Sequence, residues 1–232
     1  METITLKNGK VINYLDKING PDDVKKLSAK ELGILADEMR AALIQKLSLN
    51  GGHSGPNLGF VEATVALHYV FDSPKDKMVF DVSHQTYCHK MLTGRAQAFL
   101  DEAHYRDVSG YLNPNESEHD TFTIGHTSTS VSLAAGLAKG RDLAGGKENI
   151  IAVIGDGSLS GGEALEGLDY VGEQNTNMII VLNDNEMSIA ENHGGLYKNL
   201  ALLRETKGKA ECNMFKAWGL DYMYVDDGND VE

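Results

Sequence analysis

The chain has only two cysteines, Cys88 and Cys212, among its 232 residues. Two thiols cannot build a disulfide framework, and their spacing matches no zinc-ligand pattern. No apolar run approaches the length that spans a membrane, and the N-terminus lacks the pattern of a signal peptide. These absences favour a protein of the reducing cytoplasm, without a disulfide scaffold and without a membrane span.

Basic residues are also scarce, because 21 Lys and Arg stand against 34 Asp and Glu, for a net charge of −13. Non-specific binding to nucleic acid or to an anionic membrane needs a basic surface, so both are disfavoured. An anionic cofactor is not excluded, since a metal ion and helix N-termini can bind phosphate locally. No G-x-G-x-x-G follows an expected strand, which argues against a dinucleotide-binding protein.

The apolar fraction of 41% allows a sizeable core, and apolar segments of two kinds alternate along the chain. Short β-branched runs predict strands, and longer segments with helical spacing predict helices, the first of them opened by a capping box at residues 28–31. The pattern predicts an α/β fold with a mostly parallel sheet and helices on both faces. We expect an N-terminal arm over 1–27 and one domain over 28–232. The expected helices cover 28–50, 60–71, 129–144, 163–171 and 215–218, the strands 78–82, 150–154, 178–182 and 222–225, and the irregular segments 105–124 and 184–210.

Two polar motifs follow neighbouring strands of this sheet. Gly155-Asp156-Gly157 comes directly after the run 150–154, and Asn183-Asp184-Asn185 follows the run 178–182. Parallel sheets place their ligands at the carboxyl ends of strands, so a carboxylate and an amide oxygen are expected at one edge. Such hard oxygen ligands suit Mg²⁺ or Ca²⁺, and Mg²⁺ usually binds together with substrate phosphates.

Further blocks of sequence accompany these motifs, and together they resemble the 1-deoxy-D-xylulose-5-phosphate synthase family of transketolase-like, thiamine-diphosphate-dependent enzymes. The resemblance runs from about Leu27 to the C-terminus. It implies the thiamine-diphosphate-binding fold. The matching blocks are Gly52-His53, Asp81-Val82-Ser83-His84-Gln85-Thr86-Tyr87, Lys90-Met91-Leu92-Thr93-Gly94-Arg95, Gly125-His126-Thr127-Ser128-Thr129-Ser130 and Leu182-Asn183-Asp184-Asn185-Glu186-Met187-Ser188-Ile189.

The motifs and the resemblance together predict a metal–diphosphate site. Mg²⁺ would bridge Asp156, the side-chain oxygen of Asn185 and two phosphate oxygens, and the resemblance adds the main-chain carbonyl of Met187. Gly157 and Ser158 would offer N–H groups to the diphosphate where the next helix begins. The resemblance assigns cofactor contacts to the loop residues Gly125, His126 and Thr127, whose hydroxyl-bearing neighbours could equally cap the following helix.

Two of the eight histidines are predicted to be functional. The resemblance places His84 near the diphosphate and thiazolium side of the cofactor, and it places His53 opposite the reacting carbonyl, where an imidazole can transfer a proton. His68 lies in an apolar segment and is interpreted as a core residue, whereas four others are interpreted as structural or solvated, namely His89, His104, His119 and His193. The acidic run 115–120 is interpreted as a solvated loop face.

The resemblance implies carboligation of pyruvate with glyceraldehyde 3-phosphate, with thiamine diphosphate and Mg²⁺ as cofactors. It also places the pyrimidine-binding domain after the last residue of this sequence, so the isolated chain is expected to be inactive. A homodimer, or a complementing C-terminal half, would then be its partner. Two alternatives stay open, namely the N-terminal subunit of a split transketolase, which transfers a two-carbon ketol unit, and a non-catalytic binding module of the same fold.

Overall fold

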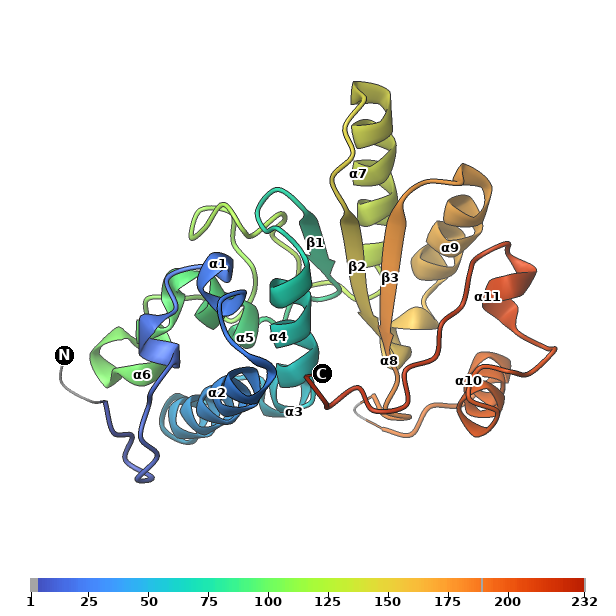
Figure 1. The fold of residues 1–232 in the computed structure, drawn as a ribbon. Helices are drawn as coiled ribbons and strands as arrows, with labels where there is room; N and C mark the ends of the chain where they lie inside the picture. Colours follow the sequence, from blue (N-terminus) through green and yellow to red (C-terminus); the bar gives the residue numbers. More distant parts are fainter. Residues whose placement is uncertain (1–3, 189, 232) are drawn as a thin grey trace. The chain divides into compact units, whose positions relative to one another are not determined.

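The computed structural model describes residues 4–188 and 190–231, and it divides the chain into two compact units. Unit 1 comprises Met1–Lys75, Ser83–Thr123 and Gly228–Glu232, and unit 2 comprises Asp76–Val82 and Ile124–Asp227. Figure 1 shows the helices and strands of both, and each unit is described here by itself.

The longest helix of unit 1, α2 (Ala29–Asn50), begins at the predicted capping box. The backbone N–H and the hydroxyl of Ser28 both donate to the Glu31 carboxylate, at 2.8 and 2.7 Å. These bonds satisfy groups that every helix start would otherwise leave open. Gly51, at a φ of +72°, ends the helix as expected, because glycine adopts this left-handed region without steric cost. The helix buries the predicted apolar face at Leu32, Leu35, Met39 and Leu43.

The N-terminal segment, predicted as an arm, contributes to the core of unit 1. Its apolar side chains pack with those of α2 in one cluster, which includes Leu15 and Val24. Glu38 of α2 is completely buried, and its carboxylate accepts the backbone N–H groups of Asn13, Tyr14 and Leu15 at 2.7 to 3.0 Å. Three such bonds replace the water that the buried carboxylate loses. The remaining helices of unit 1 are η1 (Leu15–Lys17), α1 (Pro21–Val24), α3 (Ser54–Leu58), α4 (Val61–Val70), α5 (Tyr87–Lys90), the π-helical turn η2 (Met91–Arg95), α6 (Gln97–Leu100) and η3 (Glu102–His104).

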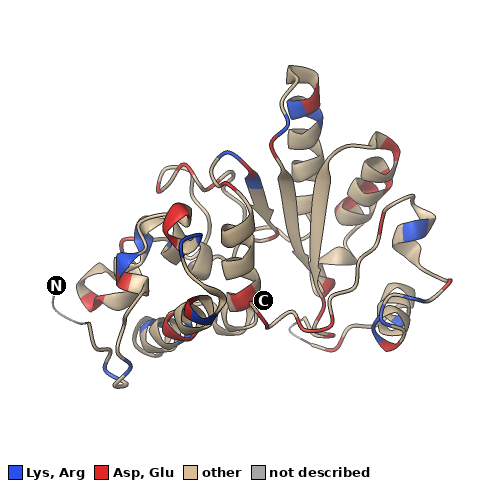
Figure 2. Cartoon of the chain, in the orientation of Figure 1, with Lys and Arg blue, Asp and Glu red and all other residues tan. Residues whose placement is uncertain are grey.

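The sheet of unit 2 is parallel, in the order β1 (Lys77–Phe80), β2 (Ile150–Gly155) and β3 (Met178–Asn183). Strand β2 is central and almost fully buried, which explains its continuous apolar sequence. Figure 2 shows β2 and β3 free of charged residues along their length. The predicted α/β class with a parallel sheet is confirmed.

Helices complete unit 2. Helix α7 (Ser130–Ala144) packs against all three strands, and α9 (Gly162–Gln174) packs against α7 (Figure 1). Small residues on α7, among them Ala134 and Ala138, are completely buried and allow this close approach. The other helices of unit 2 are α8 (Asp156–Leu159), α10 (Gly195–Glu205) and α11 (Met214–Ala217).

Two predictions about the C-terminal region were wrong. The segment 184–210 was expected to be irregular, but α10 occupies part of it and buries Leu200 and Leu203. Residues 222–225 were expected to form a strand, but they form no ladder with the sheet. The Tyr222 ring instead stacks on Phe215 at 5.5 Å, so packing of the aromatic side chains, rather than strand pairing, orders this segment.

The two cysteines lie in contrasting surroundings. Cys88 of unit 1 is completely buried, and burial raises the pKa of its thiol. Cys212 of unit 2 is exposed, with its sulfur 3.6 Å from the Asn199 side-chain amide. No helix among the described residues combines the length and the apolar character needed to cross a membrane.

Candidate functional site

The turn after β2 carries the central residue of the predicted site. Gly155 ends β2 and pairs in register with Asn183, the last residue of β3. Asp156 therefore begins the segment beyond one strand, level with Asp184 beyond the next. Gly157 and Ser158 lie in the first turn of α8 and are half-buried. The structure thus confirms that the two polar motifs lie at the same edge of the sheet.

Asp156 is in an environment that disfavours its charge. Its side chain is buried, and burial raises its pKa, with a further increase from the nearby Asp184 carboxylate. The backbone of Gly157 opposes this effect through a hydrogen bond, as does the side-chain amide of Asn192, which donates to Oδ2 at 2.8 Å. A divalent cation would stabilise the ionised form in this position, so the donor set of carboxylates and amides fits Mg²⁺.

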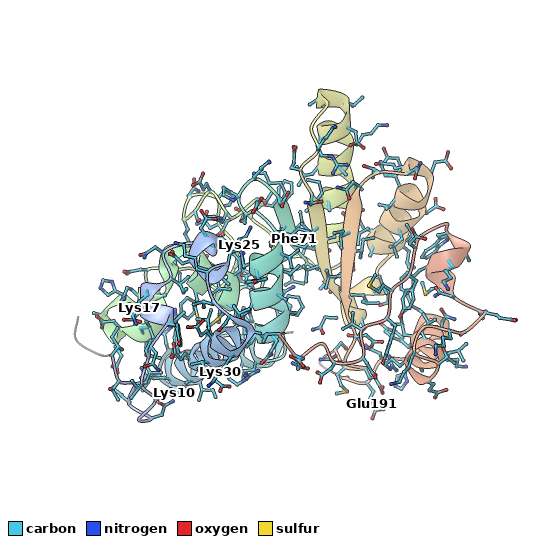
Figure 3. The ribbon with its side chains drawn as sticks, viewed as in Figure 1. Lys10, Lys17, Lys25, Lys30, Phe71 and Glu191 are labelled. Atoms are coloured by element: carbon cyan, nitrogen blue, oxygen red, sulfur yellow. The ribbon has the colours of Figure 1, made fainter. Side chains whose placement is uncertain are left out.

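The loop after β3 packs onto the same turn. A Cβ atom on Gly157 would lie 2.8 Å from Cβ of Ser188, so only glycine leaves room for the loop here. Asp184 pairs with Arg204 of α10, which ties the start of the loop to that helix. Glu191, labelled in Figure 3, returns to form an antiparallel bridge with Met187.

The two remaining predicted metal ligands lie in this loop. The side-chain oxygen of Asn185 accepts the N–H of Met187 at 3.1 Å, which forms a tight turn and leaves one of its lone pairs for another partner. Both residues are exposed at the edge of the sheet where Asp156 lies. Their ligation of a metal stays a prediction, as does the complete set of Asp156, Asn185 and Met187.

The third element of this edge is the loop before α7. Gly125, His126 and Thr127 are exposed, whereas Ser128 beneath them is buried. The ring nitrogen Nδ1 of His126 lies 3.0 Å from the carbonyl oxygen of Thr127. The loop is therefore open to a ligand at 125–127 and anchored at 128. Its contact with a cofactor stays a prediction.

The two predicted catalytic histidines lie close together in unit 1. The rings of His53 and His84 are 5.5 Å apart and meet edge to face. A completely buried asparagine joins their backbones, because Nδ2 of Asn57 donates to the carbonyl of His53 at 2.7 Å and to that of His84 at 2.8 Å. Its oxygen accepts the N–H of Tyr87 at 2.8 Å, so both ends of the Asn57 amide are engaged with the backbone. No feature of its position in the sequence indicated this role for Asn57.

Two phenol groups face His53. The hydroxyl of Tyr87 lies 3.4 Å from Nδ1, and that of Tyr111 lies 3.5 Å from Nε2. Burial raises the pKa of Tyr87, which keeps that phenol protonated. With one hydroxyl near each ring nitrogen, His53 is oriented as a group that can exchange a proton.

The acidic run 115–120 corrects one prediction, because part of it is buried rather than solvated. The Asp120 carboxylate accepts hydrogen bonds from both terminal nitrogens of the Arg95 guanidinium at 2.8 Å, and it lies 3.1 Å from Nε2 of His89. Glu116 pairs at 2.6 Å with Lys90, whose side chain is completely buried. The bonds to Arg95 and His89 hold the pKa of Asp120 well below its usual range although burial opposes them. The sequence feature that could have predicted these ion pairs is the opposite charge of the segments 90–95 and 116–120.

His68 confirms its interpretation as a core residue. It is completely buried, and its Nε2 lies 3.0 Å from Nδ1 of His89. Burial lowers the pKa of both imidazoles, so both are neutral at pH 7. Together with Asp120, Arg95, Lys90 and Glu116 these two histidines form what we call the buried polar network of unit 1.

By its parallel sheet and the polar residues at its strand ends, unit 2 is an α/β domain of the kind that binds ligands at the carboxyl edge of the sheet. The family model of 1-deoxy-D-xylulose-5-phosphate synthase matches residues 15–213. The chain therefore belongs to the 1-deoxy-D-xylulose-5-phosphate synthase family.

Similar proteins carry the corresponding name. The 1-deoxy-D-xylulose-5-phosphate synthase of Halalkalibacterium halodurans is 54% identical over 84% of this chain and 31% of its own length. That of Dictyoglomus turgidum is 53% identical over 82% of this chain and 31% of its own, and 1-deoxy-D-xylulose-5-phosphate synthase 2 of Geobacter sulfurreducens is 54% identical over 78% and 29%. The chain thus spans about a third of the length of these relatives.

Proposed function

We propose that unit 2 binds Mg²⁺ and the diphosphate of thiamine diphosphate in an enzyme that makes 1-deoxy-D-xylulose 5-phosphate. The observation that carries the proposal is the buried Asp156 at the end of β2, level in the sheet with the amide-rich end of β3. The reaction would join pyruvate to the aldehyde of glyceraldehyde 3-phosphate, with loss of CO₂. The names of the similar proteins support this reaction over ketol transfer by a split transketolase.

The edge of the sheet supplies three kinds of contact to this ligand. Asp156 and Asn185 would hold Mg²⁺ through their side chains, and Met187 through its carbonyl oxygen. Gly157 and Ser158 would donate N–H groups to phosphate oxygens where α8 begins. Gly125, His126 and Thr127 would line the other side of the diphosphate from the loop before α7.

The histidines of unit 1 would serve the reaction itself. Thiamine diphosphate supplies the electron sink for decarboxylation when it is bound. His53 would exchange a proton with the substrate carbonyl oxygen, since phenol hydroxyls lie 3.4 Å from its Nδ1 and 3.5 Å from its Nε2 and can orient the ring. His84 would contact the cofactor. A second copy, or a C-terminal half, would supply the pyrimidine side of the site.

The metal ligand provides the sharpest test of the proposal. Asp156→Ala removes the only buried carboxylate at this turn, so magnesium-dependent binding of thiamine diphosphate should fall at least tenfold. Calorimetry with both ligands measures the affinity, and omission of Mg²⁺ from wild type should reproduce the loss.

Asp169→Ala is the matched control, because it removes an exposed carboxylate from α9 of the same unit. It should bind as wild type does. Equal affinity in wild type and in Asp156→Ala would refute the assignment of the metal site.

A further inference from the structure

One buried carboxylate of unit 2 plays no part in the site described above. Asp81 follows β1 directly, and its backbone N–H donates to the carbonyl of Val153 in the neighbouring strand at 2.8 Å. Its side chain is only 1% exposed. A buried carboxylate needs hydrogen-bond donors around it. The residues that donate to Asp81 therefore indicate its role.

Two donors come from the start of α7, one from the loop before the helix and one from its first residue. The N–H of Ser128 donates to Oδ1 of Asp81, and the N–H of Ser130 donates to Oδ2, each at 2.9 Å. A bond to Ser130 alone would cap the helix, which begins at that residue. The bond to Ser128 goes further, because it fixes the loop residue that precedes the helix start.

Ser128 adopts an unusual backbone conformation. Its φ is +71°, in the left-handed region that residues other than glycine rarely adopt. Such a conformation persists only where surrounding contacts enforce it. The hydrogen bond from its N–H to Asp81 is one such contact, and its hydroxyl makes the other.

That hydroxyl connects the loop to the turn after β2. Oγ of Ser128 donates to the carbonyl of Ser158 at 2.7 Å. A Cβ atom on Gly161 would lie 1.9 Å from the same oxygen, so the space for Ser128 exists only because glycine follows α8. Ser128 therefore joins the loop 125–127 on one side to the segment that carries Asp156 and Ser158 on the other.

We propose that Asp81 and Ser128 are positioning residues, which together hold the loop 125–127 at a fixed distance from the Asp156 turn so that a diphosphate fits between them. The inference rests on the proposed function for its ligand. It adds two residues that do not touch the ligand and that act on it through the backbone. Both side-chain oxygens of Asp81 accept backbone N–H groups, so this side chain orients the loop and does not contact the ligand.

The test uses Asp81→Asn, because the amide keeps the size of the side chain and loses one of the two acceptors. Amide hydrogen exchange at Ser128 and Ser130, without any ligand, should become at least tenfold faster. The affinity for thiamine diphosphate in the presence of Mg²⁺ should fall at least tenfold in calorimetry.

Asp76→Asn is the matched control on the same strand. Asp76 precedes β1, is also buried, and accepts the N–H and the side-chain amide of Asn149 at 2.7 and 3.2 Å. It lies at the other end of the strand, away from the loop. Its substitution should lower thermal stability while the affinity and the exchange at Ser128 stay within twofold of wild type.

A rescue experiment separates positioning from general stability. Glycine adopts a positive φ without strain, so Ser128→Gly should restore part of the affinity that Asp81→Asn loses. Ser128→Ala removes the same hydroxyl but keeps the strain, and should restore none. If Asp81→Asn does not fold, Ser128→Ala by itself carries the test, with an expected loss of about threefold in affinity.

The experiments test separately the positioning role, its link to the diphosphate and the proposed function. Unchanged exchange at Ser128 in Asp81→Asn would overturn the positioning role, whether or not a ligand binds. Wild-type affinity in both Asp81→Asn and Ser128→Ala would overturn its link to the diphosphate. Absence of binding by the wild-type chain would overturn the proposed function, while the exchange data would still decide whether Asp81 holds the loop.

Discussion

The two units differ in where they place part of their charge. Unit 1 buries charged groups inside its core, where Glu38, Lys90 and Asp120 are almost inaccessible to solvent. Unit 2 keeps the strands β2 and β3 free of charge, as Figure 2 shows, and the acidic residues Asp156 and Asp184 follow the carboxyl ends of these strands. A buried charge is stable only with complete partners, whereas an apolar strand is stable by exclusion from water. The buried charges of unit 1 therefore hold structure, whereas Asn185 and the loop 125–127, at the sheet edge of unit 2, are exposed and open to a ligand.

The strongest test of this contrast removes one member of the buried polar network. Asp120→Ala removes the buried carboxylate that accepts from both terminal nitrogens of Arg95 and from His89, which leaves Arg95 with its longer pair to Glu116 at 3.4 Å, and we expect a loss of about 3 kcal/mol in the free energy of unfolding. Urea denaturation measures it. Asp107→Ala, which breaks an exposed pair with His104, should change stability by less than about 0.5 kcal/mol. Similar losses in the two variants would show that burial does not determine how much these charged groups contribute to the free energy of unfolding.

A fall in pH should change the stability contributions of titratable groups in the two units in opposite directions. The buried imidazoles of His68 and His89 have lowered pKa values, so the unfolded chain binds more protons and stability falls as the pH decreases below 6.5. The raised pKa of Asp156 has the opposite consequence, because the folded form takes up its proton first and gains stability as the pH falls from that raised value toward 3.8.

The histidine effect should be the larger, at about 1–2 kcal/mol between pH 7 and pH 5. The measurement is the free energy of unfolding in urea across this range. His89→Gln should flatten the dependence on pH, and His193→Gln, at an exposed position of unit 2, should preserve it. Equal slopes in all three proteins would contradict the buried, neutral state of the network.

The smallest expected effect concerns the capping box of α2, which is a local interaction that does not depend on buried charge. Ser28→Ala removes the hydroxyl of the capping box at the start of α2, and a loss of about 1 kcal/mol is expected. Thermal unfolding would detect it as a lower melting temperature. Ser48→Ala, near the end of the same helix, removes a hydroxyl bonded to the carbonyl of Gln45, and should cost less. A larger loss from Ser48→Ala would contradict the importance of the cap.

The sequence predicted the features that depend on neighbouring residues, and it did not predict those that depend on distant segments. The capping box, the strands and the polar motifs beyond them depend on residues adjacent in the chain, so periodicity and spacing revealed them. The roles of Glu38, Asn57 and Asp81 depend on backbone groups of distant segments. The Asp81 carboxylate, for example, binds the N–H of a residue 47 positions away. A partner that is a backbone N–H has no signature in the sequence, and so these residues were missed.

Aromatic packing explains the error at the C-terminal region. Residues 222–225 carry two tyrosines and a valine, which favour a strand by propensity. In the structure Tyr222 stacks on Phe215, and Gly208 leaves room for both Tyr222 and Tyr224. Strand propensity describes a residue that fits a half-buried surface, and here helical and loop segments provide that surface instead of a neighbouring strand.

The contrast between the two thiols has a practical consequence. A maleimide dye reacts with the thiolate, so it should modify the accessible Cys212 and leave the buried Cys88 intact in the folded protein. The native chain thus carries a single attachment point for a fluorophore or a spin label, between α10 and α11 of unit 2. Spectroscopy at this point needs no cysteine substitution, and appearance of a second reactive thiol would report the opening of unit 1 in the same sample.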